Sequence, residues 1–369
     1  MYSNVSQEWT SAQTRLLAPE GLVQIECHIP ELGTSLTFGN RDLLKFVHRQ
    51  TASLLSAELP KNHIEFSLDN SDDKWNPSNP NGLYNYLSER LKITVKYGFR
   101  LSTGVEWIPG GVFYLTEWGT TDNGYEATFV ARDILEFMID APYTGTIEGS
   151  LDSLVLAATN SVDLPSGSEV EIDSVLSQYS LGTVSPDTKH SVAEIWQKSA
   201  NASQCVMYQG REGKLAIARL DRTPVGYTIP LRLSYSYPRI EFSRPLKSIE
   251  VSYGEDLTAI RNVGVSGEIQ TLQNDFISDN DHAVEVAAWV EDNLRSRRKI
   301  RGEFRGDPRI DVFDVVAVET KYGVVGRVIL TDVKISFTGA FAVTYEGYVD
   351  VNATAVFYHS GEIYTGEVI

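Results

Sequence analysis

Residues 69–90 (DNSDDKWNPSNPNGLYNYLSER) hold the densest group of side chains that could bind a cation. Carboxylate and amide oxygens spaced along one loop are the ligands that Ca²⁺ prefers. The EF-hand pattern requires glycine at loop position 6 and glutamate at position 12. Counted from Asp69, those positions hold Lys74 and Pro80, so the EF-hand pattern fails.

The same stretch also fits a structural corner. Asn76 and Asn79 each precede a proline, which favours extended backbone, and the run Pro-Asn-Gly at 80–82 marks the beginning of a helix expected between 82 and 90. The corner explains more of these residues than a metal does, but a cation loop of another kind stays open. Such a loop would use three carboxylates: Asp69, Asp72 and Asp73.

The remaining candidates for chemistry do not form recognisable patterns. GVSGE at 264–268 resembles a nucleophile elbow, but Glu268 stands where GxSxG requires glycine. The sequence contains neither GxxxxGK[ST] nor GxGxxG, and its carboxylates are too dispersed to name an acid and base pair. Six histidines are scattered in neither HExxH nor HxH spacing: His28, His48, His63, His190, His282 and His359. We therefore predict no catalytic residue, no cofactor site and no metal site, and no enzymatic activity.

Two short motifs have structural interpretations. Cys27 and Cys205 are far apart and form no CxxC pair, so buried free thiols are expected rather than a zinc site or a disulfide. RGDP at 305–308 contains the integrin-binding tripeptide, but a turn fixed by Pro308 is the preferred interpretation.

Composition limits the classes of protein to consider. A chain of 369 residues with 42% hydrophobic and 22% charged residues is typical of a folded protein with two or three domains. Its net charge of −17 repels nucleic acid, so specific nucleic-acid binding is not expected. No apolar stretch approaches about 20 residues, and no signal peptide is recognisable at the N-terminus. We therefore expect that the chain is made in a cytoplasm and does not insert stably into a membrane.

Alternation of polar and apolar residues predicts strands along most of the chain. In the first part the predicted strands are 21–29, 43–50, 63–68, 91–99, 106–120 and 125–133. In the last part they are 246–254, 258–267, 314–320, 323–337 and 340–351.

The middle of the chain and one later segment show helical spacing. A helix is expected from Ser150, another around 189–201 with Val192, Ile195 and Trp196 on one face, and then two strands joined by a turn at 210–213. A further helix is expected at about 281–298, with Asp281 as a candidate N-cap and a basic run at its C-terminal end.

The order of these pieces resembles the tail hub proteins of bacteriophages, which include baseplate hubs and the N-terminal hub of tail-associated proteins. The first similar piece is LPKNHIEFSLDNSDDKWNPSNPNGLYNYLSERLKITVKYG, followed by EWIPGGVFYLTEW and ATFVARDILEFM. SVAEIWQKSANASQCVMYQGREGKLAI resembles the inserted α+β domain of the hub, and RPLKSIEVSYG and GDPRIDVFDVVAVET resemble its second barrel. Phe313 departs from the pattern, because a glycine commonly precedes the aspartate there.

This resemblance implies a mainly β fold in which two β-barrel-like hub domains flank a small α+β domain. The expected division is an N-terminal arm (1–19), a first barrel (20–140), the inserted domain (141–240), a second barrel (241–355) with its inserted helix, and a C-terminal tail (356–369).

The resemblance also implies a structural role in the virion, at the distal tail or baseplate. It implies a homotrimeric ring that joins the tail tube to the tail tip and leaves a channel for DNA during ejection. The expected partners are the tail tube or distal tail protein, the tape-measure protein, and tip spike or fibre proteins. A carbohydrate- or receptor-binding tail-tip module is the alternative, with Trp75, Trp107 and Trp118 as candidate stacking faces.

Overall fold

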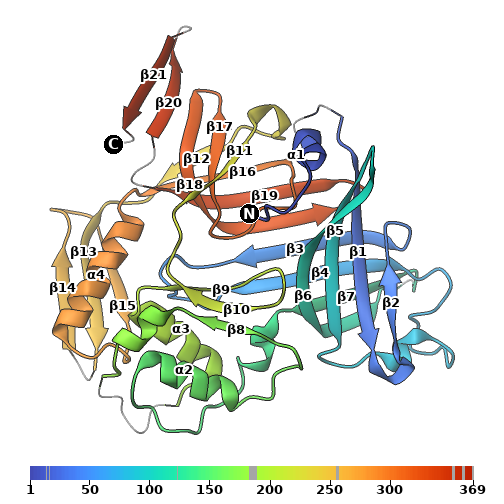
Figure 1. Cartoon of the computed structure of the whole chain (residues 1–369), viewed down its shortest axis with the longest axis horizontal. Coiled ribbons are helices and arrows are strands. Elements are labelled where there is room, and N and C mark those ends of the chain that lie inside the picture. The colour runs from blue at the N-terminus through green and yellow to red at the C-terminus, as the bar shows by residue number, and fades with distance from the viewer. Residues whose placement is uncertain are drawn as a thin grey trace.

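The structure is a computed structural model that describes residues 1–13, 15, 17–122, 124–182, 189–254 and 257–350, together with the backbone of β20 (Thr354–His359) and β21 (Glu362–Glu367). Strands dominate the described residues (Figure 1). Four α-helices accompany them: α1 (Gln7–Gln13), α2 (Leu151–Asn160), α3 (Val192–Ala202) and α4 (Asn280–Leu294). The predicted mainly β class with an α+β portion is confirmed. None of the helices in these ranges is long and apolar enough to cross a bilayer.

The largest sheet joins 15 strands, of which a continuous path runs β12-β16-β19-β18-β3-β4-β7-β6-β5-β1-β2. Its first-half strands are β1 (Glu20–Ile29), β2 (Thr34–Phe38), β3 (Leu43–Thr51), β4 (Lys61–Asp69), β5 (Lys92–Leu101), β6 (Gly104–Thr120) and β7 (Glu126–Arg132). Its second-half strands are β11 (Pro224–Ile229), β12 (Arg239–Phe242), β16 (Arg298–Arg305), β17 (Val315–Thr320), β18 (Gly323–Phe337) and β19 (Phe341–Val349), with the hairpin β20–β21 paired to β18.

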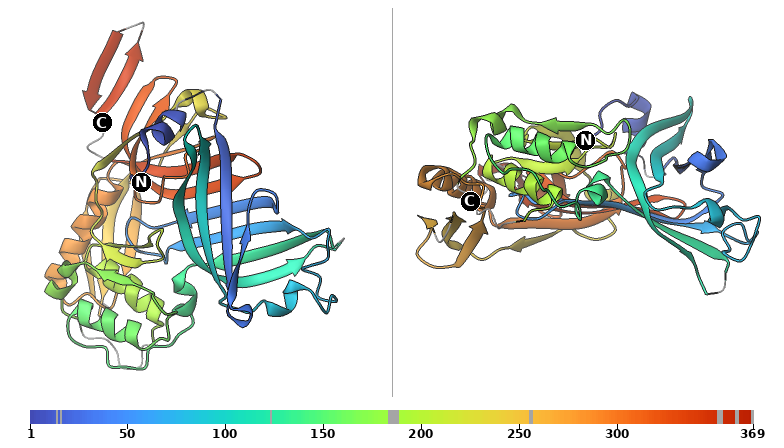
Figure 2. Two further views of the ribbon diagram at one scale, coloured as in Figure 1. Left: turned by 45° about the vertical axis from the view of Figure 1, so that its right-hand side comes forward. Right: turned by 90° about the horizontal axis from the view of Figure 1, so that it is seen from below.

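Alternating side chains set the faces of this sheet, as the sequence predicts. In β1 every second residue from Gly21 to Ile29 is buried, which is the period of a half-buried strand. The sheet bends so that β1 and β5 cross steeply over β3 and β4, and the apolar faces of both layers meet in one core (Figures 1 and 2). The six strands predicted in the first part all form.

The two β-rich parts of the chain share this sheet. β3 pairs antiparallel with β18, from Phe46 opposite Phe337 to Thr51 opposite Asp332. Among the described strands the path ends at β12 and β2, and two separately closed barrels are not seen. The domain boundaries stay predictions, but continuous pairing joins the parts expected to be the first and second barrels.

The inserted α+β portion forms as expected. β9 (Val206–Gln209) and β10 (Leu215–Ala218) are joined by the predicted turn, and β8 (Val170–Ile172) pairs parallel with β10. Ser191 and Glu194 form a capping box at the beginning of α3. The predicted helix face is confirmed, because Val192, Ile195 and Trp196 are all fully buried.

A third sheet of β13 (Leu246–Tyr253), β14 (Leu257–Asn262) and β15 (Glu268–Gln273) packs against α4. The core under α2 and α3 continues into this sheet, so the inserted portion and the beginning of the last part bury one apolar cluster. The predicted strand 258–267 is therefore too long: it ends at Asn262, and the GVSG segment turns the chain into β15.

Helix boundaries are the main errors of the sequence prediction. α4 is capped by Asp279, whose side chain accepts a hydrogen bond from the His282 amide, and not by Asp281. It ends at Leu294, and Arg298 begins β16, because Arg297 adopts a left-handed conformation with φ 51°. The helix expected at 82–90 is a single 3₁₀ turn, Leu83–Tyr86.

Elements in the predicted arm and tail were not foreseen. The arm forms α1, whose Trp9 is fully buried with its ring 4.8 Å from that of Phe99. The tail contains β21 and most of β20, while residue 351, the last of a predicted strand, lies outside the described ranges.

Candidate functional site

The acidic stretch forms a corner held by its own side chains. Asp69 Oδ1 accepts a hydrogen bond from the Ser71 amide at 2.9 Å, and Asn76 Oδ1 accepts one from the Ser78 amide at the same distance. This bond to the amide two residues on is the Asx turn, in which a short polar side chain replaces part of a backbone turn. Two members of the proposed cation set are likewise bonded within the corner, Asp72 to Lys74 and Asp73 to Asn76.

Asn70 ties the corner to the core. Its side chain, 1% exposed, accepts from the Trp75 amide at 2.7 Å and donates to the Gly124 carbonyl at 2.8 Å. The ring of Trp75 is buried between Phe38 and Phe129 and offers no stacking face. Within the described ranges no group of three or more His, Cys, Asp or Glu side chains could hold a metal ion.

The other aromatic and thiol candidates also have structural surroundings. Trp107 is 40% exposed and its ring covers Gly98, while Trp118 is half-buried against the first core. Cys27 and Cys205 are buried and unpaired, as predicted, and burial raises the pKa of their thiols to about 12 and about 11. Thiols with such a pKa are protonated at neutral pH and are poor nucleophiles.

Three histidines lie inside the protein at separate places. His48 Nε2 donates to Asn62 Oδ1 and Nδ1 accepts from the Tyr97 hydroxyl, each at 2.7 Å. Burial lowers the pKa of His48 to about 4, so the ring is neutral. His282 Nε2 lies 2.8 Å from the Ala202 carbonyl and holds α4 to the end of α3.

His190 joins a small charged group on the inserted portion. Its Nε2 lies 3.0 Å from Asp275 Oδ2, and Lys198 Nζ lies 2.6 Å from Asp275 Oδ1. Burial raises the pKa of Asp275, but hydrogen bonds from His190 and Lys198 outweigh it and hold the pKa at about 2. Asp275 is therefore an ionised anchor that connects α3 to the segment before α4.

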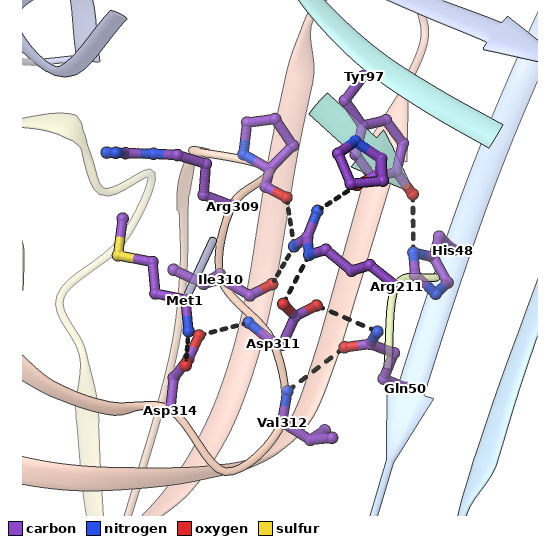
Figure 3. A network of polar contacts seen from close by, with 12 residues as sticks. Met1, His48, Gln50, Tyr97, Arg211, Arg309, Ile310, Asp311, Val312 and Asp314 are labelled. Atoms are coloured by element: carbon purple, nitrogen blue, oxygen red, sulfur yellow. Dashed lines mark hydrogen bonds and ion pairs between the residues drawn. The ribbon is translucent and has the colours of Figure 1, made fainter. Parts of the chain in front are cut away.

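The most extensive polar contact lies where the three parts of the chain meet, and we call it the Arg211 clasp (Figure 3). Arg211, in the turn between β9 and β10, lies with its side chain only 7% exposed. Its Nε donates to Asp311 Oδ2 at 2.6 Å. Nη1 donates to the Pro109 carbonyl of β6 at 3.0 Å, and Nη2 donates to the Pro308 carbonyl at 2.7 Å. One guanidinium thus joins the inserted portion to both β-rich parts.

Neighbouring groups extend the clasp. Gln50 of β3 donates to Asp311 Oδ1 at 3.2 Å and accepts from the Val312 amide at 3.3 Å. Asp314 Oδ2 accepts from the Asp311 amide at 2.7 Å, and its other oxygen forms an ion pair with the amino group of Met1 (Figure 3). The residues at 308–314 are therefore held from the N-terminal arm, from β3 and from the inserted portion.

Two features noted in the sequence lie in or beside this loop: RGDP at 305–308 and Phe313. Pro308 and Arg309 form the predicted turn, and Asp307 is fully buried with both carboxylate oxygens bonded by the Arg309 guanidinium. A buried aspartate cannot be presented to an integrin. Phe313 adopts φ 67°, the left-handed conformation that favours glycine.

The clasp forms one wall of a surface pocket of about 320 Å³. Arg211, Asp311 and Asp314 of this wall are bonded to other protein groups, and Arg219 and Asp221 also line the pocket. The clasp itself pairs no nucleophile with a general base, and its chemistry is that of a joint. No local pattern points to Arg211 beyond its place in a Gly-containing turn, because its partners lie about 100 residues away on either side.

Comparisons with known proteins bear on the whole chain. No protein-family model matches the sequence, and no curated protein is similar to it in sequence. The prophage MuSo2 43 kDa tail protein from Shewanella oneidensis matches the structure with a TM-score of 0.59 at 10% identity, covering 89% of this chain and 98% of that one. The chain has the fold of phage tail proteins.

Two further solved structures share this tail-protein fold. The tail protein from Neisseria meningitidis MC58 matches with a TM-score of 0.61 at 10% identity, over 89% of this chain and 96% of its own. The prophage tail protein gp18 from Listeria monocytogenes EGD-e matches with a TM-score of 0.55 at 11% identity, over 89% and 95%. At such low identity the likeness concerns the fold, and at that level the expected resemblance to phage tail proteins is confirmed.

Proposed function

We propose that this chain is a structural protein of a phage tail or of a phage-derived particle, placed in the virion at the distal tail or baseplate. The observation that carries the proposal is the extent of the shared fold. It spans 89% of this chain and at least 95% of each of three tail proteins, so the likeness is not that of one common module. A shared fold does not by itself determine function, and the proposal therefore needs a direct test.

In the finer form of the proposal, three copies form a ring that joins the tail tube to the tail tip. The two β-rich parts of each copy would give the ring a pseudo-sixfold inner arrangement, which suits a junction between a hexameric tube and a threefold tip. Its neighbours would be the tube or distal tail protein, the tape-measure protein, and tip spike or fibre proteins. The Arg211 clasp supports a rigid role, because it fixes the two β-rich parts and the inserted portion to one another.

DNA would pass through the opening of this ring without being bound. The net charge of −17 supports this part of the proposal, since a lumen lined with carboxylates repels phosphate groups. Charge reversal of lumen carboxylates to lysine is expected to slow DNA ejection, and unchanged ejection would count against an acidic channel.

The role is structural rather than catalytic. Two charged groups described above are used in joints: Asp275 with His190 and Lys198, and Asp311 with Arg211. Each has a charged or hydrogen-bonding partner that ties two segments together, which is an architectural use of charge.

The test is the mass of the purified chain in solution together with negative-stain imaging. The expected result is a species of three subunits that images as a ring with a central opening. A protein that remains monomeric at the highest attainable concentration would contradict a self-sufficient ring. Closed particles without an opening would contradict the DNA passage.

A further inference from the structure

β12, a strand at the end of the large sheet, is exposed to solvent along its whole length. β12 pairs only with β16 among the described strands, and all four of its residues are exposed. Two of them are large and apolar: Ile240 is 40% exposed and Phe242 is 67% exposed. Exposed apolar edge strands are sites of association with another chain unless something covers them.

Aromatic residues extend this surface beyond β12. Tyr235 and Tyr237, just before the strand, are 60% and 64% exposed, and so is Tyr322 at 64% in the β17–β18 turn. Lys321 Nζ lies 6.0 Å from the ring centre of Tyr237 and 4.7 Å from that of Tyr322. Tyrosine is among the residue types enriched in protein contact surfaces.

The two segments that form this edge are rich in basic residues although the protein is strongly acidic. Three of their basic side chains form ion pairs: Arg244 with Glu268, Lys299 with Glu346 and Arg301 with Glu241. Residues 232–247 contain four basic residues and one acidic residue, and residues 295–305 contain six basic residues and one acidic residue. We call these two segments together the aromatic–basic edge. β12 and β16 bring them side by side, with Arg239 opposite Arg301 and Phe242 opposite Arg298.

The segment between these two has the opposite charge. Residues 248–294 contain ten acidic residues and one basic residue. In α4 the buried face packs on the β13–β15 sheet, and the solvent face carries three exposed carboxylates, those of Asp281, Glu285 and Asp292. They lie on one side of the helix because their spacing of four and seven residues is close to whole turns. We call this surface the α4 acidic face, and it lies at a margin of the molecule (Figure 1).

We propose that the aromatic–basic edge of one copy docks against the α4 acidic face of a second copy. This inference rests on the proposed function, since it names the surfaces through which the hub would assemble. Charge complementarity favours a second copy as the occupant, because each copy carries both partners of the contact. Two basic edges repel each other, so the contact joins two different surfaces of the chain, as a ring of identical subunits requires.

Two pairs of substitutions test the docking. Arg239→Glu with Arg244→Glu reverses charge on the edge, and Glu285→Lys with Asp292→Lys reverses charge on the helix face. All four side chains are exposed, and lysine near the C-terminal end of α4 suits the helix dipole, so folding is expected to persist and circular dichroism checks it. The control pair Lys92→Glu with Lys96→Glu makes the same charge change on exposed positions of β5.

Sedimentation equilibrium of the full chain measures self-association. Each test pair is expected to lower the self-association constant about tenfold or more, whereas the control pair is expected to change it by less than about twofold. The chain that carries both test pairs is expected to regain association close to that of the wild type. High salt is expected to weaken the wild-type contact.

Each other outcome overturns the docking. If the wild type assembles and the test pairs assemble equally well, this contact is wrong while the hub proposal stands. If the wild type never assembles, the docking and the self-sufficient ring both fail. If the edge pair weakens association but the combined chain does not recover, the α4 acidic face is not the occupant. Binding of a labelled oligonucleotide is measured on the same proteins. If the wild type binds it, and the edge pair abolishes this binding without changing self-association, the edge is a nucleic-acid surface.

Discussion

Arg211 Nε and Asp311 Oδ2 lie 2.6 Å apart although 100 residues separate them, and the rest of the guanidinium is bonded to backbone carbonyls of both β-rich parts. A charge buried in this way stabilises a fold mainly by being fully paired, because removing one partner leaves the other uncompensated. Loss of the clasp is therefore expected to destabilise all three parts of the chain.

We expect Arg211→Met to destabilise the protein by about 3 kcal/mol, because Asp311 loses its charged partner and the carbonyl oxygens of Pro109, Pro308 and Ile310 lose this donor. Urea unfolding followed by circular dichroism measures this. Arg219→Met is the matched control at an exposed position of the same portion, expected to change the free energy of unfolding by less than about 0.5 kcal/mol. Equal effects of the two substitutions would show that the clasp carries no special stability.

A second prediction concerns Phe313, whose φ of 67° is costly for a residue with a side chain. Its ring packs on Tyr208 at 5.8 Å, so truncation loses contacts whichever small residue replaces it. Phe313→Gly and Phe313→Ala share that loss and differ in backbone strain. We expect the glycine variant to be more stable than the alanine variant by about 1 kcal/mol.

Differential scanning calorimetry of the two variants measures the difference. The same pair of substitutions at Tyr322, which is exposed and has no positive φ, is the control, and there alanine is expected to equal or exceed glycine. An alanine variant at 313 as stable as the glycine variant would mean that the turn relaxes without strain.

Local patterns in the sequence predict those elements of the fold whose burial follows a strand or helix period. Burial alternates along β1 and β7 because one face is buried, and α3 has apolar residues at helical spacing, so these elements can be predicted without the structure. β12 is harder to predict: its four residues alternate polar and apolar, but the run is at the lower length limit of a strand signal, and all four residues are exposed. The basic run before β16 was assigned to the end of α4, because Arg and Lys suit a helix C-terminus as well as an edge strand.

The candidate site is less predictable than the fold. The corner could be predicted because Asn76 and Asn79 precede prolines and the run Pro-Asn-Gly follows at 80–82. The Asx turns that hold it are a finding of the structure. Arg211 offers no such signal, because its partners are brought to it only when the two β-rich parts meet. The N-cap of α4 failed for a smaller reason: two aspartates two residues apart both suit the position, and only the extended backbone at Asp279 decides.

A third prediction concerns Asp133, whose burial raises its pKa to about 7. Its Oδ1 accepts from the Leu135 amide at 3.1 Å, while Oδ2 has no hydrogen-bond partner. The folded-state pKa lies above the unfolded value of 3.8, so the folded state binds the proton more tightly. The contribution of this group to stability is thus complete below about pH 4 and is lost as pH rises through about 7.

Asp133→Asn keeps the acceptor at the 3₁₀ turn and removes the charge. We expect the variant to gain stability relative to the wild type as pH rises from 5 to 8, by about 1 kcal/mol or more. Urea unfolding at both pH values measures the difference. If the difference in free energy of unfolding between the variant and the wild type is the same at pH 5 and pH 8, Asp133 does not titrate in this range.

The last prediction concerns the corner at residues 69–79. Asn70→Ala removes the acceptor of the Trp75 amide and the donor to the Gly124 carbonyl at a position 1% exposed. Unsatisfied buried groups cost about 1 to 3 kcal/mol each, so we expect a loss of about 2 kcal/mol or more and a lower Tm. Asn81→Ala, exposed in the same corner, is the control and should leave Tm nearly unchanged. Each protein is melted with and without EDTA. Because side-chain hydrogen bonds account for the corner, chelator is expected to leave all three Tm values in place, and a wild-type Tm that falls with EDTA would favour the cation loop.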